Sequence, residues 1–330
     1  MAAHARSVME ANGVSDIVTV IQGAVEDVIL PAEDYASKLL EPEEEGEESE
    51  HRVVDIMISE WMGYFLLRES MLDSLVRARD RFLKVNTGLM MPSHAIMYLA
   101  PITNEGDRRA GASEYAGAMG DWAEFVESTS GTYGVDMSVL ESEFDREQRE
   151  YYMLSSRWCE LQPDQVLTTH PKEIKRLDMF TCTLEDAKGL SMEEDGYSGD
   201  FDFDLEADKI PSNSPVSGFA GWFTVDFKSR TDDVGVRHAP RVPNPAHLST
   251  APEEGYTHWG QQAFHLPSAI PLISGETTNL RGTLQMTRTA ENLRLYNCMI
   301  RYKGSRRKTG TGEDENFMTG KEVEAVYQIP

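Results

Sequence analysis

The sequence predicts an α/β segment followed by a β-rich domain that carries a helical insertion. Up to residue 92, amphipathic stretches alternate with short apolar runs, the pattern of parallel strands connected by helices. From residue 93 onward, short apolar or β-branched runs are separated by turn residues, which is typical of a sandwich or barrel. Residues 104–157 interrupt this second pattern with apolar residues whose spacing predicts helices. We therefore expect domains at residues 1–92 and 93–330.

The α/β segment is predicted to contain two helices and two strands. Residues 2–12 predict a helix that stops at Asn12 and Gly13. Residues 17–22 predict a short strand, and the apolar run at 53–58 predicts a strand buried on both faces. The amphipathic stretch at 70–82 predicts the second helix. Its apolar face would hold Met71, Leu72, Leu75, Val76 and Phe82, and its polar side Arg77, Arg79 and Lys84.

An acidic insertion separates the two predicted strands. Residues 32–52 include the run Glu-Pro-Glu-Glu-Glu-Gly-Glu-Glu-Ser-Glu at 41–50. Like charges at this density repel one another and cannot pack, so we expect a disordered loop. The alternative is an acidic arm that attracts basic substrates.

The β-rich domain is predicted to contain several short strands. They are expected at Ala95–Ala100, Phe180–Leu184, Gly221–Phe227, Gln261–Leu266, Gly282–Thr287 and Leu293–Arg301. The helical insertion carries apolar residues that require a packing partner: Trp122, Phe125, Tyr133, Val135, Met137 and Leu140.

Charge and composition exclude several classes of function. The net charge of −25 argues against nucleic acid or an anionic membrane as a primary partner and suits a basic ligand or protein. No apolar run approaches the ~18 residues that span a membrane, and the N-terminus has no secretory signal. The three cysteines contain no CxxC pair, so neither a disulfide scaffold nor a structural metal site is expected. We expect a protein of the nucleus or cytoplasm.

Two glutamates, Glu60 and Glu69, flank a loop that follows the predicted strand at 53–58. This loop lies at the carboxyl edge of a parallel sheet, where open α/β folds bind ligands. Paired carboxylates bind a guanidinium well, because its planar fork matches their oxygens. The alternatives are solvated loop residues, a helix N-terminal acid at Glu69, or glycosidase chemistry, for which sugar-binding aromatic platforms are not evident.

Several motifs resemble one family. Ser59–Leu72, Ser-Glu-Trp-Met-Gly-Tyr-Phe-Leu-Leu-Arg-Glu-Ser-Met-Leu, resembles the double-glutamate loop of the protein arginine N-methyltransferases. Val20–Val28 before it and Gly88–Pro92 after it agree with that family. Tyr256–Phe264 resembles the family's Thr-His-Trp loop in the form of type I members, which make asymmetric dimethylarginine. Tyr133–Ser138 resembles a segment in or beside its dimerisation arm.

The resemblance implies a fold, a reaction and partners. Residues 1–92 would be the C-terminal portion of a Rossmann-like S-adenosylmethionine methyltransferase domain. Residues 93–330 would be a β-barrel substrate domain with a dimerisation arm at about 104–157, and the protein would be a homodimer. The reaction would transfer a methyl group from S-adenosylmethionine to an arginine guanidinium nitrogen. Its substrates would be proteins such as Gly/Arg-rich proteins or histones.

The resemblance also implies roles for five residues around the substrate arginine. Glu60 and Glu69 would bind the guanidinium, and Tyr64 and Trp259 would shape the arginine slot. His258 would orient the pocket and assist proton loss. Without the resemblance, His258 would be interpreted as a structural histidine, and both glutamates as solvated loop residues.

Four residues would contact the cofactor. Val25 and Glu26 match positions that meet the adenine, with Glu26 accepting a hydrogen bond from its amino group. Ser74 matches another cofactor contact, and Met71 would touch both substrate and cofactor. Without the resemblance, Met71 would be a core residue and Glu26 a loop acid.

The sequence departs from the family in its cofactor-binding part and at Arg68. In the cofactor-binding part, it contains no GxGxG turn after an apolar strand, and the family's second-strand acidic residue is also missing. We therefore expect impaired cofactor binding, no methyl transfer by the chain alone, and an exposed edge and apolar face at the strand of residues 53–58. The alternative function is a catalytically silent paralogue or fragment that dimerises with an active enzyme. In addition, Arg68 replaces an aromatic residue, and we expect its side chain to point to solvent rather than back onto Glu60 or Glu69.

Overall fold

The computed structural model describes residues 1–30, 52–190, 199–210, 214–230, 241–308, 314–315 and 322–329. Apart from Arg52, the predicted acidic insertion lies outside these residues. The helices are α1 (Ala2–Ala11), α3 (Leu72–Phe82), α4 (Glu105–Tyr133) and α5 (Glu141–Met153), with short 3₁₀ turns between strands. The strands are β1 (Ile56–Ile58), β2 (Leu89–Met91), β3 (His94–Ile102), β4 (Arg157–Cys159), β5 (Lys172–Asp178), β6 (Gly189–Leu190), β7 (Gly199–Glu206), β8 (Val216–Phe227), β9 (Ala246–Ser249), β10 (Gln261–Ile270), β11 (Glu276–Arg288), β12 (Tyr296–Lys308), β13 (Asp314–Glu315) and β14 (Val323–Ile329).

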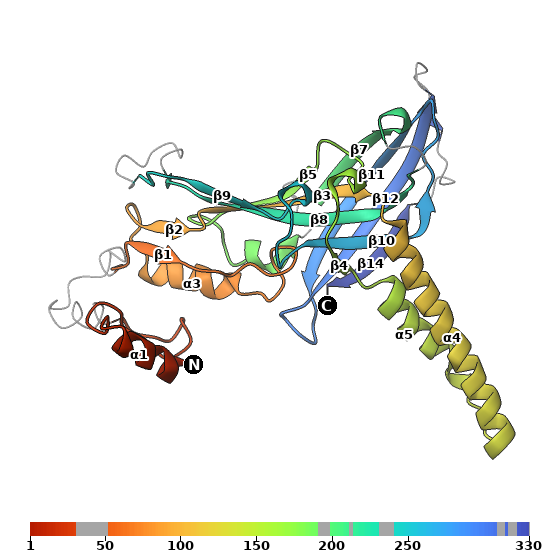
Figure 1. The fold of residues 1–330 in the computed structure, drawn as a ribbon, viewed down its shortest axis with the longest axis horizontal. Helices are drawn as coiled ribbons and strands as arrows, with labels where there is room; N and C mark the ends of the chain where they lie inside the picture. Colours follow the sequence, from red (N-terminus) through yellow and green to blue (C-terminus); the bar gives the residue numbers. More distant parts are fainter. Residues whose placement is uncertain are drawn as a thin grey trace.

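Two large sheets form the body of the molecule (Figure 1). The first has the strand order β4-β10-β8-β3-β5, with β9 paired to β8. The second has the order β13-β12-β11-β6, with β14 paired to β12 and β7 paired to β11. Neither sheet closes on itself among the described residues.

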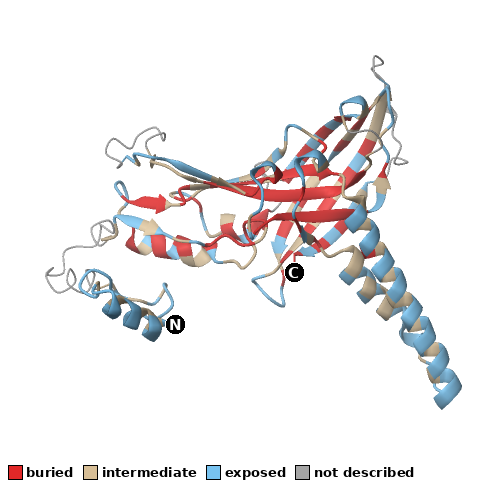
Figure 2. Ribbon diagram, viewed as in Figure 1, coloured by how far each residue is buried: buried red, intermediate tan, exposed pale blue. Residues whose placement is uncertain are grey.

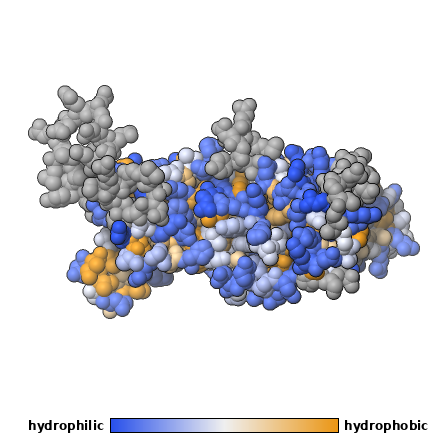
Figure 3. Space-filling model, turned by 90° about the horizontal axis from the view of Figure 1, so that it is seen from above, coloured by the Kyte–Doolittle hydropathy of each residue, from blue (hydrophilic) through white to orange (hydrophobic). Residues whose placement is uncertain are grey.

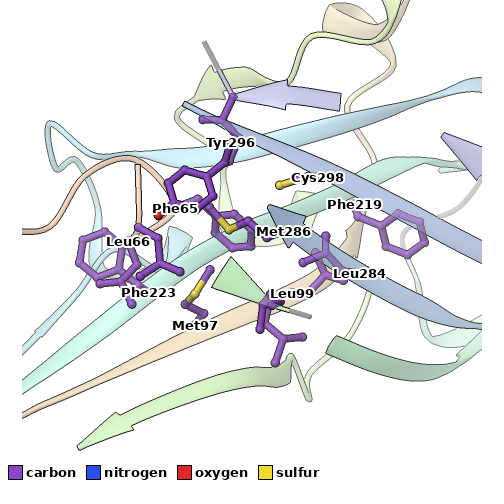
Figure 4. Packing of buried hydrophobic residues seen from close by; sticks show 14 of the residues in the cluster. Phe65, Leu66, Met97, Leu99, Phe219, Phe223, Leu284, Met286, Tyr296 and Cys298 are labelled. Atoms are coloured by element: carbon purple, nitrogen blue, oxygen red, sulfur yellow. The ribbon is translucent and has the colours of Figure 1, made fainter. Parts of the chain in front are cut away.

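The main hydrophobic core lies between these sheets. In the burial view β8 is buried along most of its length, whereas strands of the second sheet show buried positions interspersed with more exposed ones (Figure 2). In β7 the sequence Gly-Asp-Phe-Asp-Phe-Asp-Leu-Glu alternates strictly between buried and exposed residues, as expected for a strand with one face on the core. Met97 of β3, Phe223 of β8 and Met286 of β11 meet in one buried cluster (Figure 4).

The α/β segment is smaller and more exposed than the sequence predicted. β1 pairs in parallel with β2, Ile56 opposite Leu89, and has no second neighbour among the described residues. Its Ile56 and Ile58 side chains are 54% and 78% exposed. The prediction of a strand buried on both faces was therefore wrong, whereas the expected exposed edge and apolar face are present. In the space-filling view, hydrophobic residues gather at the left end of the molecule, the end at which Figure 1 shows β1 and β2 (Figure 3).

Two further predictions in this segment were wrong. The predicted strand at 17–22 is irregular, because these residues have no strand to pair with in the described part and Ile17 is exposed. Arg79, predicted to face solvent, is buried because its guanidinium donates to the carbonyls of Met179 and Cys182. Helix α1 is confirmed, although none of its residues is buried.

Helix α3 begins at Leu72, two residues later than predicted, because Ser70 has a left-handed backbone with φ of 55°. Leu72, Leu75, Val76 and Phe82 are buried on its inner face as expected. Met71, assigned to the same face, is instead 46% exposed at the helix N-terminus.

The predicted helical insertion forms a hairpin of α4 and α5 that projects from the body (Figure 1). The Asn104 side chain caps α4 by accepting from the Asp107 amide, and Gly134 ends it in a left-handed conformation. Trp122 of α4 stacks on Phe144 of α5 with ring centroids 4.5 Å apart. No described helix is both long and apolar enough to cross a membrane.

Most of the predicted strands of the β-rich domain are confirmed. The predictions at 95–100, 221–227, 261–266 and 282–287 fall inside β3, β8, β10 and β11, and the one at 293–301 overlaps β12. Residues 180–184 form turns rather than a strand. The predictions named examples of the strands, and none of them covers β4, β5, β6, β7, β9 or β14.

Candidate active site

The loop between β1 and α3 carries Glu60 and Glu69, the two glutamates predicted to bind the guanidinium and called the clamp glutamates below. It leaves the carboxyl end of β1, where the Ser59 amide donates to the Met91 carbonyl at 3.0 Å. Inside the loop, the Gly63 amide donates to the Leu66 carbonyl at 2.9 Å. A Cβ at Gly63 would lie 1.8 Å from the Arg68 carbonyl oxygen, so only glycine fits this tight turn.

The middle of this loop is anchored in the core rather than exposed. Phe65 and Leu66 are buried among side chains from both sheets (Figure 4). The Phe65 ring meets Phe264 edge to face, with centroids 5.7 Å apart, and lies directly over Gly221 of β8. The loop is therefore held by the β-rich domain.

A second loop meets the first through two residues that are 197 positions apart in the sequence. The Trp259 indole nitrogen donates to the Met62 carbonyl at 2.8 Å, and Trp259 packs against Phe223. The His258 ring lies over the Trp259 ring at a centroid distance of 3.7 Å and is exposed to solvent. No hydrogen bond to the His258 ring is made by any described residue. The structure thus brings the Thr-His-Trp segment against the double-glutamate loop.

The two glutamates differ in their surroundings. Glu69 is 38% exposed, and its Oε2 accepts from Arg294 at 3.1 Å. Its backbone has a left-handed φ of 83°. Glu60 is exposed and forms no hydrogen bond or ion pair with the described residues. One carboxylate is therefore engaged and the other open to solvent.

Arg68 does not point to solvent as predicted. Its guanidinium lies 5.3 Å from the centre of the Tyr64 ring, and its Nη1 is 3.6 Å from Glu69 Oε1. A cation–π contact with Tyr64 and attraction to Glu69 hold the side chain against the loop. The two oxygens of Glu69 thus each face an arginine of the same chain.

The predicted cofactor residues form a separate group beside the start of α3. Ser74 Oγ donates to Glu26 Oε1 at 2.5 Å, and Arg81 donates to the Glu26 carbonyl at 2.7 Å. The hydrogen bond from Ser74 lowers the pKa of Glu26 below its ordinary value. Val25 and Met71 are partly exposed next to these residues in sequence. Glu26 and Ser74, 48 residues apart, are thus brought into contact.

Several residues around the loop were missed by sequence reasoning. Arg288, Tyr296 and the turn at 289–295 contact residues 69–73, yet they lie more than 200 residues downstream. Only the fold brings them there, so no local pattern could have indicated them. In the described part of the chain, no group of three or more His, Cys, Asp or Glu residues could hold a metal ion.

Comparison with known proteins agrees with this arrangement. The family profile described as "Arginine methyltransferase oligomerization subdomain" matches residues 93–307. "Protein arginine N-methyltransferase PRMT10" of Arabidopsis thaliana is 39% identical over 307 residues, 91% of this chain and 69% of that protein. The chain belongs to the protein arginine N-methyltransferase family. Proteins of this family are S-adenosylmethionine-dependent methyltransferases that act on protein arginine.

Further relatives and solved structures support the assignment. "Probable protein arginine N-methyltransferase 6.1" of Oryza sativa subsp. indica is 30% identical over 91% of this chain and 68% of that protein. The crystal structure of Arabidopsis thaliana protein arginine methyltransferase 10, described as uniquely open, matches with a TM-score of 0.76 and 35% identity. It covers 100% of this chain and 80% of that chain. The predicted family and the fold class, Rossmann-like methyltransferase plus β-barrel, are confirmed.

Proposed function

We propose that the two joined loops form the arginine-binding half of a type I methyltransferase site, which makes asymmetric dimethylarginine. The observation that carries this proposal is the hydrogen bond from Trp259 to Met62, which joins the double-glutamate loop to the Thr-His-Trp loop. These two segments are far apart in the sequence, and each resembles a motif of the family. Their meeting at the carboxyl edge of β1 supports a shared site.

Glu60 and Glu69 would hold the guanidinium of the substrate arginine. Glu69 already engages guanidinium groups of its own chain, Arg294 at 3.1 Å and Arg68 at 3.6 Å, so its carboxylate is accessible to this group. Two carboxylates on one side would concentrate the positive charge there and leave the other terminal nitrogen better able to attack a methyl group. Holding this nitrogen in line with the methyl donor is a positioning effect, which supplies a large part of catalysis in such reactions.

The attacking nitrogen must lose a proton as the new N–CH₃ bond forms. His258 is exposed beside Trp259 and would pass this proton to solvent. Trp259 is buried and uses its N–H on Met62, so it would support the arginine slot from below. Tyr64, half-buried on the loop, would line the slot.

S-adenosylmethionine supplies the methyl group when it is bound. The described residues fit its adenine end: Glu26 offers a half-buried carboxylate, of which one oxygen accepts from Ser74, and Val25 and Met71 are exposed close to these two residues in sequence. The sequence has no Gly-rich turn for the methionine end. We therefore propose that a polypeptide of these 330 residues binds the cofactor weakly and does not transfer methyl groups alone.

The substrates would be arginine-containing proteins, such as Gly/Arg-rich proteins or histones, in the nucleus or cytoplasm. The net charge of −25 supports a basic substrate, because opposite charges speed and strengthen association.

The protein would form a homodimer through the α4–α5 hairpin. Phe125, Val139 and Leu140 are exposed apolar residues of this hairpin, and exposed apolar patches mark interaction surfaces. Removing residues 104–157 should give a monomer in light scattering. A stable, fully active monomer would contradict this role.

A second candidate function is a catalytically silent partner that dimerises with an active paralogue. The 330-residue polypeptide, which contains no GxGxG turn, would act in this way. A silent partner, however, has no need for Glu60, Glu69, His258 and Trp259.

Label incorporation separates the two functions. Two proteins are each incubated with labelled S-adenosylmethionine and a Gly/Arg-rich peptide. One is the 330-residue polypeptide, and the other is a fusion that places the Gly-rich cofactor-binding segment expected of the family before residue 1. Transfer by the fusion alone supports the enzyme. Transfer by neither supports the silent partner, and transfer by the polypeptide contradicts its proposed inactivity.

A further inference from the structure

The backbone of the second clamp glutamate is held in an unfavourable conformation. Glu69 and Ser70 have φ angles of 83° and 55°, in the left-handed region that residues other than glycine rarely adopt. Phe65 and Leu66, earlier in the loop, share this feature. Such conformations persist only where surrounding contacts enforce them, and Glu69 therefore requires such contacts.

The contacts come from the turn between β11 and β12. The Glu69 amide donates to the Arg294 carbonyl at 2.9 Å. Ser70 Oγ lies 2.5 Å from the Leu293 carbonyl oxygen and 3.1 Å from the Tyr296 hydroxyl. Both residues that need support are thus bonded to one distant turn.

A partly buried network fixes this turn to the start of α3. The Tyr296 side chain is fully buried, and its hydroxyl accepts from Arg288 Nε at 3.0 Å and donates to the Ala187 carbonyl at 3.1 Å. Arg288 binds both Asp73 oxygens, at 2.8 and 2.6 Å, and also donates to the Ala187 carbonyl. Bidentate pairs of this kind are strong and directional. The hydrogen bond to Asp73 also raises the pKa of Arg288 above its ordinary value, so its charge is permanent.

We infer that Arg288 and Tyr296 are positioning residues of the methyl-transfer site. Neither contacts the Glu69 carboxylate. Arg288 orients Asp73 and the Tyr296 hydroxyl. That hydroxyl contacts Ser70 Oγ, and Ser70 in turn holds the backbone of the adjacent Glu69 in place. This inference rests on the proposed role of Glu69 in binding the substrate arginine.

The Arg294 side chain, unlike Arg288 and Tyr296, contacts the Glu69 carboxylate itself. Its guanidinium is largely exposed and makes one contact with Glu69, which a substrate guanidinium can replace. The network of Arg288, Tyr296, Asp73 and Ser70 does not have to open for this exchange. The clamp backbone therefore stays fixed while its carboxylate changes partner.

The test compares two substitutions that each remove one buried hydroxyl. Tyr296→Phe removes the hydroxyl that meets Ser70 and Arg288. Tyr327→Phe is the matched control, because Tyr327 is equally buried and its hydroxyl donates to the His265 carbonyl at 2.8 Å, outside the network. Amide hydrogen exchange is measured in the 330-residue polypeptide, which requires neither substrate nor cofactor.

Tyr296→Phe should accelerate exchange of the Glu69 and Ser70 amides about tenfold, the effect of one lost hydrogen bond, and leave β14 unchanged. Tyr327→Phe should leave both loop amides at the wild-type rate. Equal acceleration of the loop in both variants, or none in Tyr296→Phe, overturns the inference. Ser70→Ala, at a half-exposed site, removes the contact with Tyr296 from the loop side together with the one to the Leu293 carbonyl, and it serves if Tyr296→Phe does not fold.

Kinetics of the fusion distinguish positioning from general stability. Tyr296→Phe should lower kcat/KM for the peptide about tenfold while KM for S-adenosylmethionine stays unchanged. Wild-type kcat/KM in this variant overturns the inference. If the wild-type fusion transfers no methyl groups, the proposed function fails, while the exchange measurement still decides whether the network fixes Glu69.

Discussion

Gly221→Ala tests whether the double-glutamate loop is held from the β-rich domain. Gly221 lies in the middle of β8, and a Cβ there would come 2.1 Å from Cε2 of the Phe65 ring. Phe65 is 2% exposed and anchors the loop between Glu60 and Glu69. The new methyl group must therefore displace the ring or push β8 outward.

The size of the effect is bounded on both sides. Overpacking a core by one methyl group costs about 1–3 kcal/mol, and complete loss of a buried Phe side chain costs about 3–5 kcal/mol. Replacing Gly by Ala in a strand returns about 0.5–1 kcal/mol. A clash at 2.1 Å places the overpacking cost in the upper half of its range, about 2–3 kcal/mol, because the ring can shift rather than leave its site. After subtraction of the gain from replacing Gly, we expect a net destabilisation of about 1–2.5 kcal/mol.

Urea unfolding of the 330-residue polypeptide measures this change as a shift in midpoint at constant slope. The second substitution Phe65→Leu removes the clash, so the double variant should be more stable than the sum of the two single changes. Wild-type stability in Gly221→Ala, or strict additivity in the double variant, would refute the packing of Phe65 over Gly221.

Three further predictions concern other parts of the chain. Ser74→Ala should raise the pKa of Glu26 in an NMR titration. Because Ser74 lowers this pKa, its stabilising effect is present above the unfolded pKa of ~4.3 and is lost as the pH falls through the folded value. Burial raises the pKa of Cys159 to about 12 and of Cys182 to about 11, so neither should react with iodoacetamide at pH 8 unless urea unfolds the protein. Gly117→Ala should stabilise α4 by about 0.5–1 kcal/mol in thermal unfolding, because Gly117 is exposed in the helix and a Cβ there meets nothing within 4 Å.

Elements with a strong local pattern were predicted well from the sequence. The period of α3 and the apolar runs of β3, β8, β10 and β11 are local signals, and the structure contains each of them. β7 was missed although its Asp-Phe-Asp-Phe alternation is a clear strand signal. The burial of the strand at 53–58 was predicted wrongly, because burial depends on neighbouring strands and not on the run itself.

The site could be predicted only in part. Glu60, Glu69, His258 and Trp259 are proposed as site residues because two short motifs carry them, and the structure brings these two motifs into contact. The orientation of Arg68 was wrong because its contact with Tyr64, four residues earlier, depends on the left-handed turns of the loop. Arg288 and Tyr296 act across more than 200 residues, so their part follows only from the fold.

Glu69 is proposed to bind the substrate guanidinium during methyl transfer. The most direct test measures label transfer to a Gly/Arg-rich peptide by the fusion and by its Glu69→Gln variant, with Glu160→Gln as an exposed control. We predict asymmetric dimethylarginine from the wild-type fusion and the control, and no transfer from Glu69→Gln with its thermal unfolding unchanged. Undiminished transfer by the Glu69→Gln variant would contradict the assignment.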